Sequence, residues 1–358
     1  MNNRTKVVVA MSGGVDSSVA AVLLVNQGYD VSGAFMKNWS IDMEGVDYKP
    51  WENEANDAKL VCETLNIPFE IYDFEKEYRQ KVVDEFIDQY ALGVTPNPDV
   101  LCNKEIKFNL FLNRAMSSGA EYIATGHYAR LMRHGDKFAL AAGIDANKDQ
   151  SYFLYTLDQF QMSHTLFPLG DLTKSEVRII AERANLSNCN KKDSQGVCFI
   201  GPVSMRKFLQ QFLDIKPGDV VTTNGDIVGK HDGVIYYTEG QRHGFGSGGA
   251  HAPLYIAEKN VVTNQLTVAN SGDSILLTDR IVISECTWSN QNPKSRKKYG
   301  VRVRYRQPLV NAKLAELESK NWGVQFEIPI LGVSIGQSVV VYDGKEVVGG
   351  GIITSRIA

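Results

Sequence analysis

The sequence predicts an α/β protein with a doubly wound parallel sheet, followed by a small β-rich domain and a C-terminal β-barrel. Three observations predict this fold class. Between residues 6 and 184, short apolar runs alternate with helical patterns, as in a parallel sheet covered by helices. From residue 216 onward, β-type runs are separated by turn sequences such as PGD, NGD and HDG. Closer to the C-terminus, four further runs have the length expected for an antiparallel barrel.

The change in pattern along the chain indicates where domains begin and end. A chain of 358 residues is long enough for two or three domains. We expect a first domain, 1–203, that carries the parallel sheet and the catalytic groups. A small β-rich domain, 204–272, and a barrel, 273–358, complete the chain.

Each element of the first domain follows from a local pattern. The first apolar run, KVVVA, has the length of a buried strand, and the helical pattern after it ends at Gly28, a residue typical of helix ends. The predicted strands are residues 6–10, 30–36, 69–74 and 122–125. The predicted helices are residues 17–27, 52–65, 78–90, 104–116 and 174–184. A further helix, 205–212, is predicted just after the boundary, at the start of the middle domain.

The barrel is predicted from four runs, ILLT, VRVRYR, WGVQFEI and SVVVYDG, which recur at strand lengths. The glycine-rich segment 240–249 of the middle domain could suggest a phosphate loop. No strand and helix flank it, so we interpret it as β-turns.

The composition is that of an ordinary globular protein, with 43% hydrophobic and 22% charged residues. No apolar run approaches the roughly 18 residues of a membrane helix, and the N-terminal residues lead directly into the first strand pattern without a signal peptide. We therefore expect a cytoplasmic protein that does not associate with a membrane, and a monomer.

Five cysteines without a secretory signal predict reduced thiols rather than a disulfide framework. No CxxC or cysteine–histidine cluster has zinc spacing, and the sequence leaves the ligands of any metal ion unknown. Any cysteine with a special role is therefore expected to be reactive. The five are Cys62, Cys102, Cys189, Cys198 and Cys286.

The segment AMSGGVDSS, residues 10–18, lies between the first predicted strand and helix. Its glycines allow backbone N–H groups to surround an anion at the helix N-terminus. It lacks the ending of a Walker A loop and the GxGxxG of a dinucleotide fold. SGGVDS resembles the pyrophosphate-binding loop of ATP pyrophosphatases, which implies ATP as a substrate. The alternative is a tight turn with Asp16 as a helix N-terminal acid.

Two further motifs contain cysteines. In PNPDVLCN, Asp99 precedes Cys102 by three residues in a loop that leads into a helix, and a helix N-terminus is expected to lower the pKa of a thiol. In DSQGVCFIG, glycine and serine surround Cys198, which is typical of a mobile loop. Taken alone, either cysteine is more often structural than catalytic.

The pyrophosphate loop, NPDxxC and GVCF together resemble the tRNA-specific 2-thiouridylase family over essentially the whole chain. This resemblance implies an adenine nucleotide α-hydrolase-like sheet and an ATP-dependent sulfur transfer. Wobble uridine in tRNAs for Lys, Glu and Gln would be adenylated on its C2 oxygen, giving 2-thiouridine, AMP and pyrophosphate. Mg²⁺ would accompany ATP, and sulfur would come from a cysteine desulfurase or a sulfur carrier protein.

The resemblance also implies a role for each site residue. Cys198 would carry sulfur as a persulfide, Cys102 would attack it, and Asp99 would act as acid or base. Either the persulfide attacks C2 directly or Cys102 first releases hydrosulfide, and both routes end in a Cys102–Cys198 disulfide. The ATP contacts would be Ala10, Met11, Ser12, Gly13, Gly14, Val15, Asp16, Ser17, Met36 and Gly126. The target-base contacts would be Asn97, Pro98 and Asp99, and the other tRNA contacts His127, Lys148, Asp149, Gln150, Arg304, Tyr305 and Gln337.

Charge patterning gives a separate indication of a nucleic-acid partner. The net charge is −3, yet a segment without Asp or Glu carries seven basic residues, which favours contact with a phosphate backbone. As a strand, VRVRYR would present one basic and one apolar face, and the alternative is a solvated barrel face. The seven are Lys294, Arg296, Lys297, Lys298, Arg302, Arg304 and Arg306.

Two other functions remain open from the sequence. A small-molecule ligase of the ATP pyrophosphatase class would share the loop but need neither cysteine nor tRNA. A non-catalytic, nucleotide-gated RNA-binding protein could use its cysteines as a redox switch, although this would not explain the position of Asp99 beside Cys102.

Overall fold

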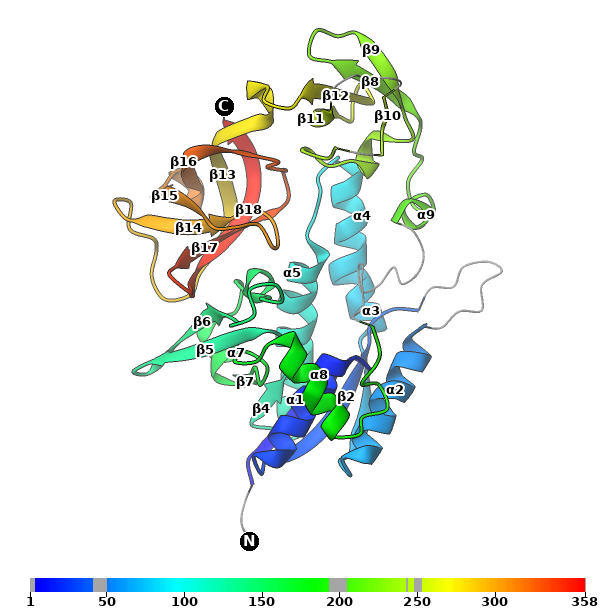
Figure 1. The fold of residues 1–358 in the computed structure, drawn as a ribbon, viewed down its shortest axis with the longest axis vertical. Helices are drawn as coiled ribbons and strands as arrows, with labels where there is room; N and C mark the ends of the chain where they lie inside the picture. Colours follow the sequence, from blue (N-terminus) through cyan, green and yellow to red (C-terminus); the bar gives the residue numbers. More distant parts are fainter. Residues whose placement is uncertain (1–3, 41–49, 193–204, 243, 248–252, 358) are drawn as a thin grey trace.

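A computed structural model describes residues 4–40, 50–192, 205–242, 244–247 and 253–357. Cys198 and the GVCF motif lie outside the described residues. The chain forms a parallel-sheet domain, a barrel and a smaller β-rich unit (Figure 1).

The first domain contains the predicted parallel sheet, with strand order β3-β2-β1-β4-β7. All neighbouring strands in it run parallel. The central strand, KVVVAM, is almost entirely buried because helices cover both of its faces. The strands are β1 Lys6–Met11, β2 Asp30–Lys37, β3 Phe69–Asp73, β4 Tyr122–Ala124 and β7 Thr165–Leu166.

Alternate side chains of β1 face two separate cores, which makes the sheet doubly wound. Val7 and Val9 pack with α1 Val15–Asn26, α2 Pro50–Thr64 and α8 Lys174–Arg183. Val8 faces the opposite core, which two long helical runs cover. The first run consists of α3 Glu75–Tyr78, η1 Arg79–Val83 and α4 Asp84–Ala91, and the second of α5 Pro98–Cys102, η2 Asn103–Phe111 and α6 Leu112–Ser117.

Both runs differ from the prediction in one respect. Each contains a π-helical segment, η1 or η2, that hydrophobic periodicity does not reveal. The second run also begins at Pro98 rather than at residue 104. Asn97 caps it through Oδ1, which accepts from Val100 N at 3.4 Å, and proline is favoured at the first helical position.

The sequence analysis missed a hairpin made by β5 Ala129–His134 and β6 Lys137–Ala142. It lies on the side of the parallel-sheet domain that faces the barrel (Figure 1). Ala141 of β6 pairs with Glu346 of β18, so the hairpin extends the barrel sheet. The short elements η3 Ser151–Phe153 and α7 Gln159–Ser163 follow it.

The middle unit is β-rich, as predicted, with strand order β10-β9-β8-β12-β11. Its helix α9 Met205–Leu209 is shorter than expected. The 240–249 segment contributes only the two-residue strand β10 within its described part. The elements are β8 Gly218–Thr222, β9 Ile227–His231, η4 Val234–Tyr236, β10 Gly246–Ser247, β11 Leu254–Asn260 and β12 Gln265–Asn270.

The C-terminal unit is a closed antiparallel barrel, because β13 pairs with both β16 and β18. The strands are β13 Leu277–Trp288, β14 Lys298–Arg302, β15 Val310–Glu316, β16 Trp322–Leu331, β17 Ser338–Asp343 and β18 Glu346–Ile357. The short helices η5 Ser274–Leu276 and η6 Glu318–Lys320 complete it. The predicted fold class is thus confirmed.

One expectation for the barrel is wrong. VRVRYR is not a continuous strand, since β14 ends at Arg302 and the chain then turns, reaching a left-handed φ of 63° at Arg306. No helix in the described part of the chain has both the length and the apolar character needed to cross a bilayer.

Candidate active site

The glycine-rich loop joins β1 to α1 at the carboxyl edge of the sheet. Gly14 is the N-cap residue of α1, and no side chain caps this end. Because the first N–H groups of a helix have no partner within it, they can bind an anion, which the helix dipole also favours. Ser17 Oγ braces the loop by accepting from Ser12 N and donating to Gly14 O, both at 3.1 Å.

Two glycines bring other backbone segments against this loop. Gly13 has a φ of 71°, and a Cβ there would lie 2.4 Å from Glu54 O. Gly126 follows β4, and a Cβ there would lie 2.6 Å from Ser17 N. Both positions therefore require glycine, and Gly126 lies directly against the start of α1.

Asp16, the carboxylate of the loop, is held by two side chains from distant parts of the chain. Lys174 Nζ and Tyr128 OH both donate to Asp16 Oδ1, at 2.7 and 2.8 Å. Lys174 belongs to α8, which packs beside α1. The acid therefore lies in a polar network, which a tight turn with a simple helix N-terminal acid would not require.

A second pair of side chains holds the loop at Gly13. Asn188 Nδ2 donates to Gly13 O at 3.0 Å, and Lys191 Nζ donates to the same oxygen at 3.2 Å. Lys191 also pairs with Asp57 at 2.7 Å. The sequence analysis did not identify Tyr128, Lys174, Asn188 or Lys191, because no local motif marks a residue that reaches the loop only in the folded chain.

The remaining residues predicted to contact ATP are largely apolar. Ala10, Met11 and Val15 are buried, and Met36 is half-buried near the end of β2. Met11 and Val15 belong to the core that packs against α1, and Ala10 belongs to the core on the opposite face of the sheet. The polar surface of the loop comes from Ser12, which is exposed, and from the helix N–H groups. The loop therefore offers an anion the helix N–H groups and the Ser12 hydroxyl.

The PNPD segment leads into α5, and the barrel holds it from outside. Gln337 Nε2 donates to Thr95 O at 2.9 Å and to Pro96 O at 3.2 Å. Lys259 of the middle unit donates to Thr95 Oγ1 at 3.0 Å. All three units of the chain therefore meet at the loop that precedes Asp99.

The sequence led us to expect Cys102 at an exposed helix end, and this expectation is wrong. Cys102 lies in the last position of α5, inside a continuous helical run, and is only 2% exposed. Burial raises the pKa of its thiol, while the Lys107 cation opposes this effect and the neighbouring Asp99 adds to it. The expected lowering of the pKa is therefore wrong for the chain without ligands.

Asp99 and His127 share the surroundings of Cys102. Burial raises the pKa of the Asp99 carboxyl, against the opposing effect of Lys107. Burial and the Lys107 charge hold the pKa of His127 well below its usual range, so its imidazole is neutral. His127 Nδ1 lies 2.7 Å from Thr125 Oγ1, and its ring packs on Phe108 of η2 at 5.8 Å.

Known proteins match this chain over nearly its full length. The tRNA methyl transferase HUP domain matches residues 5–202, the tRNA methyl transferase PRC-barrel domain residues 206–270, and the aminomethyltransferase beta-barrel domain residues 278–353. A tRNA-specific 2-thiouridylase MnmA of Hydrogenovibrio crunogenus is 47% identical, covering 99% of this chain and 95% of its own. The chain belongs to the tRNA-specific 2-thiouridylase family.

Other members of the family are similarly close. The relatives of the same name from Nitrosomonas eutropha and Bacillus subtilis are both 46% identical. They cover 99% and 98% of this chain, and 100% and 95% of their own length. Among solved structures, a 4-thiouridine synthetase–RNA complex with bound ATP covers 58% of this chain and 50% of its own, at 18% identity and a TM-score of 0.36. A likeness at that level carries no functional argument.

In this 2-thiouridylase family member, several residues expected to contact tRNA have partners within the chain. Asp149 is buried and pairs with Arg302 of the barrel at 2.7 Å. Gln150 Oε1 accepts from Tyr128 N at 3.0 Å, and Lys148 is half-buried beside them. The 148–150 segment therefore connects the parallel-sheet domain to the barrel.

The same holds for the barrel residues expected to contact tRNA. Arg304 donates to Glu239 O of the middle unit and to Ser334 Oγ. Tyr305 packs on Phe153 with ring centroids 4.5 Å apart. These barrel residues therefore lie where the three units of the chain meet. Each of the three, Arg304, Tyr305 and Gln337, contacts a residue of a different unit.

The basic segment is also partly neutralised. Lys297 pairs with Asp343, Lys298 with Glu327, and Arg302 with Asp149. None of these acids lies within the segment, so the sequence could not reveal the pairing. The continuous basic face that the sequence favoured is thus interrupted by two acids from other strands, Asp343 and Glu327, and by Asp149 from the loop between β6 and η3.

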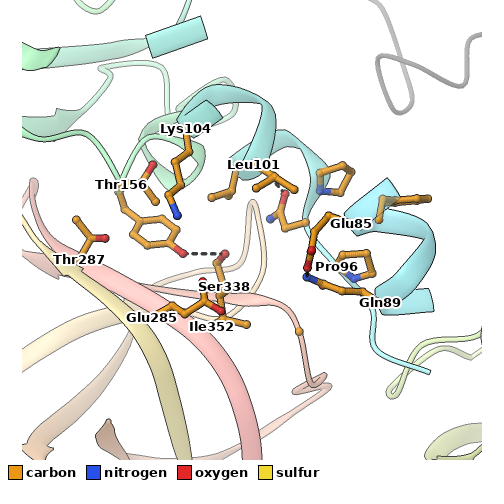
Figure 2. Close-up of a pocket in the computed structure, with 16 residues that line it drawn as sticks. Glu85, Gln89, Pro96, Leu101, Lys104, Thr156, Glu285, Thr287, Ser338 and Ile352 are labelled. Carbon is orange, nitrogen blue, oxygen red and sulfur yellow. Dashed lines mark hydrogen bonds between the residues drawn. The ribbon is translucent and has the colours of Figure 1, made fainter. Parts of the chain in front are cut away.

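A pocket opens between the PNPD loop and the barrel (Figure 2). Pro96, Leu101 and Lys104 line it on the helical side, and Glu285 and Ser338 on the barrel side. Asn97 and Pro98, two of the predicted target-base contacts, belong to the same lining. The loop thus has an open space on its barrel side.

The buried Arg302–Asp149 pair is expected to stabilise the contact between the barrel and the parallel-sheet domain. Its side chains are 15% and 2% exposed, and Asp149 Oδ1 also accepts from Gly143 N and Ser151 N. Arg302→Met would leave a buried carboxylate without its cation, costing about 3 kcal/mol or more. We expect the melting temperature to fall by roughly 5 °C or more.

The control for this prediction is Lys298→Met, which removes the exposed pair with Glu327. Such a pair contributes about 0–1 kcal/mol, so thermal denaturation should change by no more than roughly 2 °C. Equal effects of the two substitutions would show that the buried pair does not stabilise the junction.

Proposed function

We propose that this chain is a tRNA 2-thiouridylase, an enzyme that replaces the C2 oxygen of a tRNA uridine with sulfur at the cost of ATP. The observation that carries the proposal is the position of the dipeptide Gly126-His127. Gly126 lies against the N-terminus of α1, and His127 packs on η2, the segment that follows Cys102. This dipeptide therefore links the glycine-rich loop, residues 10–18, to the helical run that carries Asp99 and Cys102, and it follows β4 at the carboxyl edge of the sheet, where open α/β folds bind ligands.

The glycine-rich loop, residues 10–18, which we call the phosphate loop, would hold the ATP phosphates through the N–H groups at the start of α1. The absence of side chains at Gly13, Gly14 and Gly126 would leave room for the phosphates. When bound, ATP supplies an adenylyl group that turns a carbonyl oxygen into a leaving group. Lys174 and Lys191 lie beside the loop, and Asp16 is its carboxylate. Mg²⁺ is expected to accompany ATP, and within the described residues no group of three or more His, Cys, Asp or Glu side chains is placed to hold a metal ion.

Asn97, Pro98 and Asp99 would bind the target base beside Cys102. The raised pKa of Asp99 suits a group that exchanges a proton near neutral pH, since burial favours its protonated form. The neutral imidazole of His127 can donate one hydrogen bond and accept another without adding charge to the site. These residues would orient the uridine and handle protons while the reaction proceeds.

Cys198 would bring the sulfur as a persulfide, received from a cysteine desulfurase or a sulfur carrier protein. Either its terminal sulfur attacks C2 directly, or Cys102 first frees hydrosulfide by attacking the persulfide. Both routes leave a Cys102–Cys198 disulfide that must be reduced before the next turnover. The substrate would be wobble uridine in tRNAs for Lys, Glu and Gln, and the reaction would be cytoplasmic and carried out by a monomer.

The test is an assay of the purified chain with ATP, Mg²⁺, a cysteine desulfurase with cysteine, and unmodified tRNA transcripts. We expect 2-thiouridine in nucleoside digests, with about one pyrophosphate released per thiolated uridine. A transcript with cytidine at the wobble position is the matched control and should give neither product. Cys198→Ser should abolish thiolation while ATP-dependent adenylation continues.

Two results would reject the proposal. Pyrophosphate released with a small amine or acid but not with tRNA would indicate a ligase of the same ATP-using class. RNA binding without pyrophosphate or thiouridine would indicate a non-catalytic binding protein.

A further inference from the structure

The helical register beside Cys102 brings a lysine close to the side chains of Asp99, Cys102 and His127, which we call the thiol centre. Asp99 and Cys102 are three residues apart at the start of the run, so they share a face of the helix. From Asn103 to Phe111 the run is π-helical, and a π-helix closes its hydrogen bonds over five residues. Lys107, five residues after Cys102, therefore lies on the same face, one wide turn further along.

The surroundings agree with this register. Lys107 is half-buried, and its charge acts on three groups: Asp99, Cys102 and His127. His127 belongs to another element, the segment after β4, and its ring packs on Phe108, the residue next to Lys107. Lys107 is therefore near enough for its charge to act on all three side chains.

We propose that Lys107 is a positioning residue of the thiol centre, whose ammonium stabilises the negative charge of Cys102 when that thiol reacts. This rests on the proposed role of Cys102 in sulfur transfer. The proton leaves Cys102 Sγ for the Asp99 carboxylate, so a thiol and a carboxylate become a thiolate and a carboxylic acid. Lys107 keeps its proton, and the total charge of the three groups is unchanged.

The other groups around Cys102 fit this assignment. Among the described residues, those that act on the thiol are Asp99, Lys107 and Tyr78, and Tyr78 donates a hydrogen bond to it. Asp99 opposes a thiolate until it takes up the proton, and His127 is neutral. Lys107 is thus the cation of this group, and without it a buried thiolate would be strongly disfavoured.

The test measures the reactivity of Cys102 with iodoacetamide as a function of pH, by mass spectrometry of the peptide that contains it. In Lys107→Met and Lys107→Gln we expect the alkylation rate at about pH 7.5 to fall roughly tenfold or more. The pH midpoint should rise by about one unit or more, since loss of a nearby opposite charge shifts a pKa by that amount. Lys107→Arg should keep the midpoint of the unchanged protein.

The matched control is Lys81→Met, which removes an exposed lysine that pairs with Glu105 of η2 at 3.1 Å. It should leave the midpoint unchanged. An unmoved midpoint in both neutral Lys107 variants, or an equal shift in Lys81→Met, would overturn the proposal. Lys107→Arg is the independent check should the neutral variants not fold: it keeps the cation beside Cys102, so a pH midpoint raised by about one unit in that variant would reject the arrangement.

Alkylation needs neither ATP nor tRNA, so failure here and failure of the proposed function are distinguishable. Thiolation by the unchanged protein with no midpoint shift in the neutral variants would reject only the role of Lys107. A shifted midpoint in a chain that makes no thiouridine would reject the sulfurtransferase function.

Discussion

Replacing Cys102 by serine is expected to abolish 2-thiouridine formation while ATP-dependent pyrophosphate release persists. A hydroxyl neither ionises near neutral pH nor attacks a persulfide, so the sulfur step should slow by about 10³-fold or more. The phosphate loop lies on another element, α1, and should remain intact. Nucleoside mass spectrometry and a pyrophosphate assay on the same sample measure the two steps separately.

Cys62→Ala is the control for this prediction. Cys62 is also fully buried, but it packs in the core on the opposite face of the sheet, where burial raises its pKa to about 11. Losing its sulfur should cost about 1 kcal/mol of stability and leave thiolation within roughly twofold. Persistent thiolation in Cys102→Ser, or its loss in Cys62→Ala, would contradict the assignment of Cys102.

Replacing Gly13 by alanine is expected to remove ATP-dependent activity. The new Cβ would lie 2.4 Å from Glu54 O, and a φ of 71° disfavours any residue with a side chain. The loop must move to relieve this contact, and a displacement of about 1 Å in a reacting geometry costs about 100-fold in rate. Pyrophosphate release in the presence of tRNA should fall by at least that factor.

Gly28→Ala separates this effect from a general cost of alanine at positive φ. Gly28 follows the other end of α1, has a φ of 86°, and no atom lies within 4 Å of a Cβ placed there. The substitution should cost about 1–2 kcal/mol in stability and leave the rate within roughly twofold. Equal loss of activity in the two variants would mean that Gly13 matters for folding rather than for phosphate binding.

Four of the five strands of the parallel sheet could be predicted because each carries its own local signal, whereas the two-residue strand β7 was missed because it is too short to show a pattern. KVVVA is a buried apolar run, and Gly28 ends the helix that follows it. The hairpin of β5 and β6 has a weaker signal, since its partner is β18 of the barrel, more than 200 residues later in the chain. The sequence of a strand that pairs with another domain does not reveal its pairing partner.

The barrel shows the same limit for charge. The sequence segment from Lys294 to Arg306 contains no acid, which favours a phosphate-binding face. In the fold, Asp343, Glu327 and Asp149 reach three of its basic side chains from other elements. Counting charges along the chain cannot anticipate these pairs, because opposite charges meet through folding rather than through sequence order.

The sequence by itself determined the glycine-rich loop between β1 and α1 and the α/β class. Both depend on neighbouring residues, namely glycines at a strand-to-helix turn and apolar periodicity. Only the tertiary structure decided the direction in which the pKa of the Cys102 thiol shifts. That pKa depends on the burial of the thiol and on the charge of Lys107, which a π-helical turn brings to the same face of the helix as Cys102. Likewise, only the fold placed Lys174, Asn188 and Lys191 at the loop, since side chains distant in sequence meet there through packing of the helices and loops around β1.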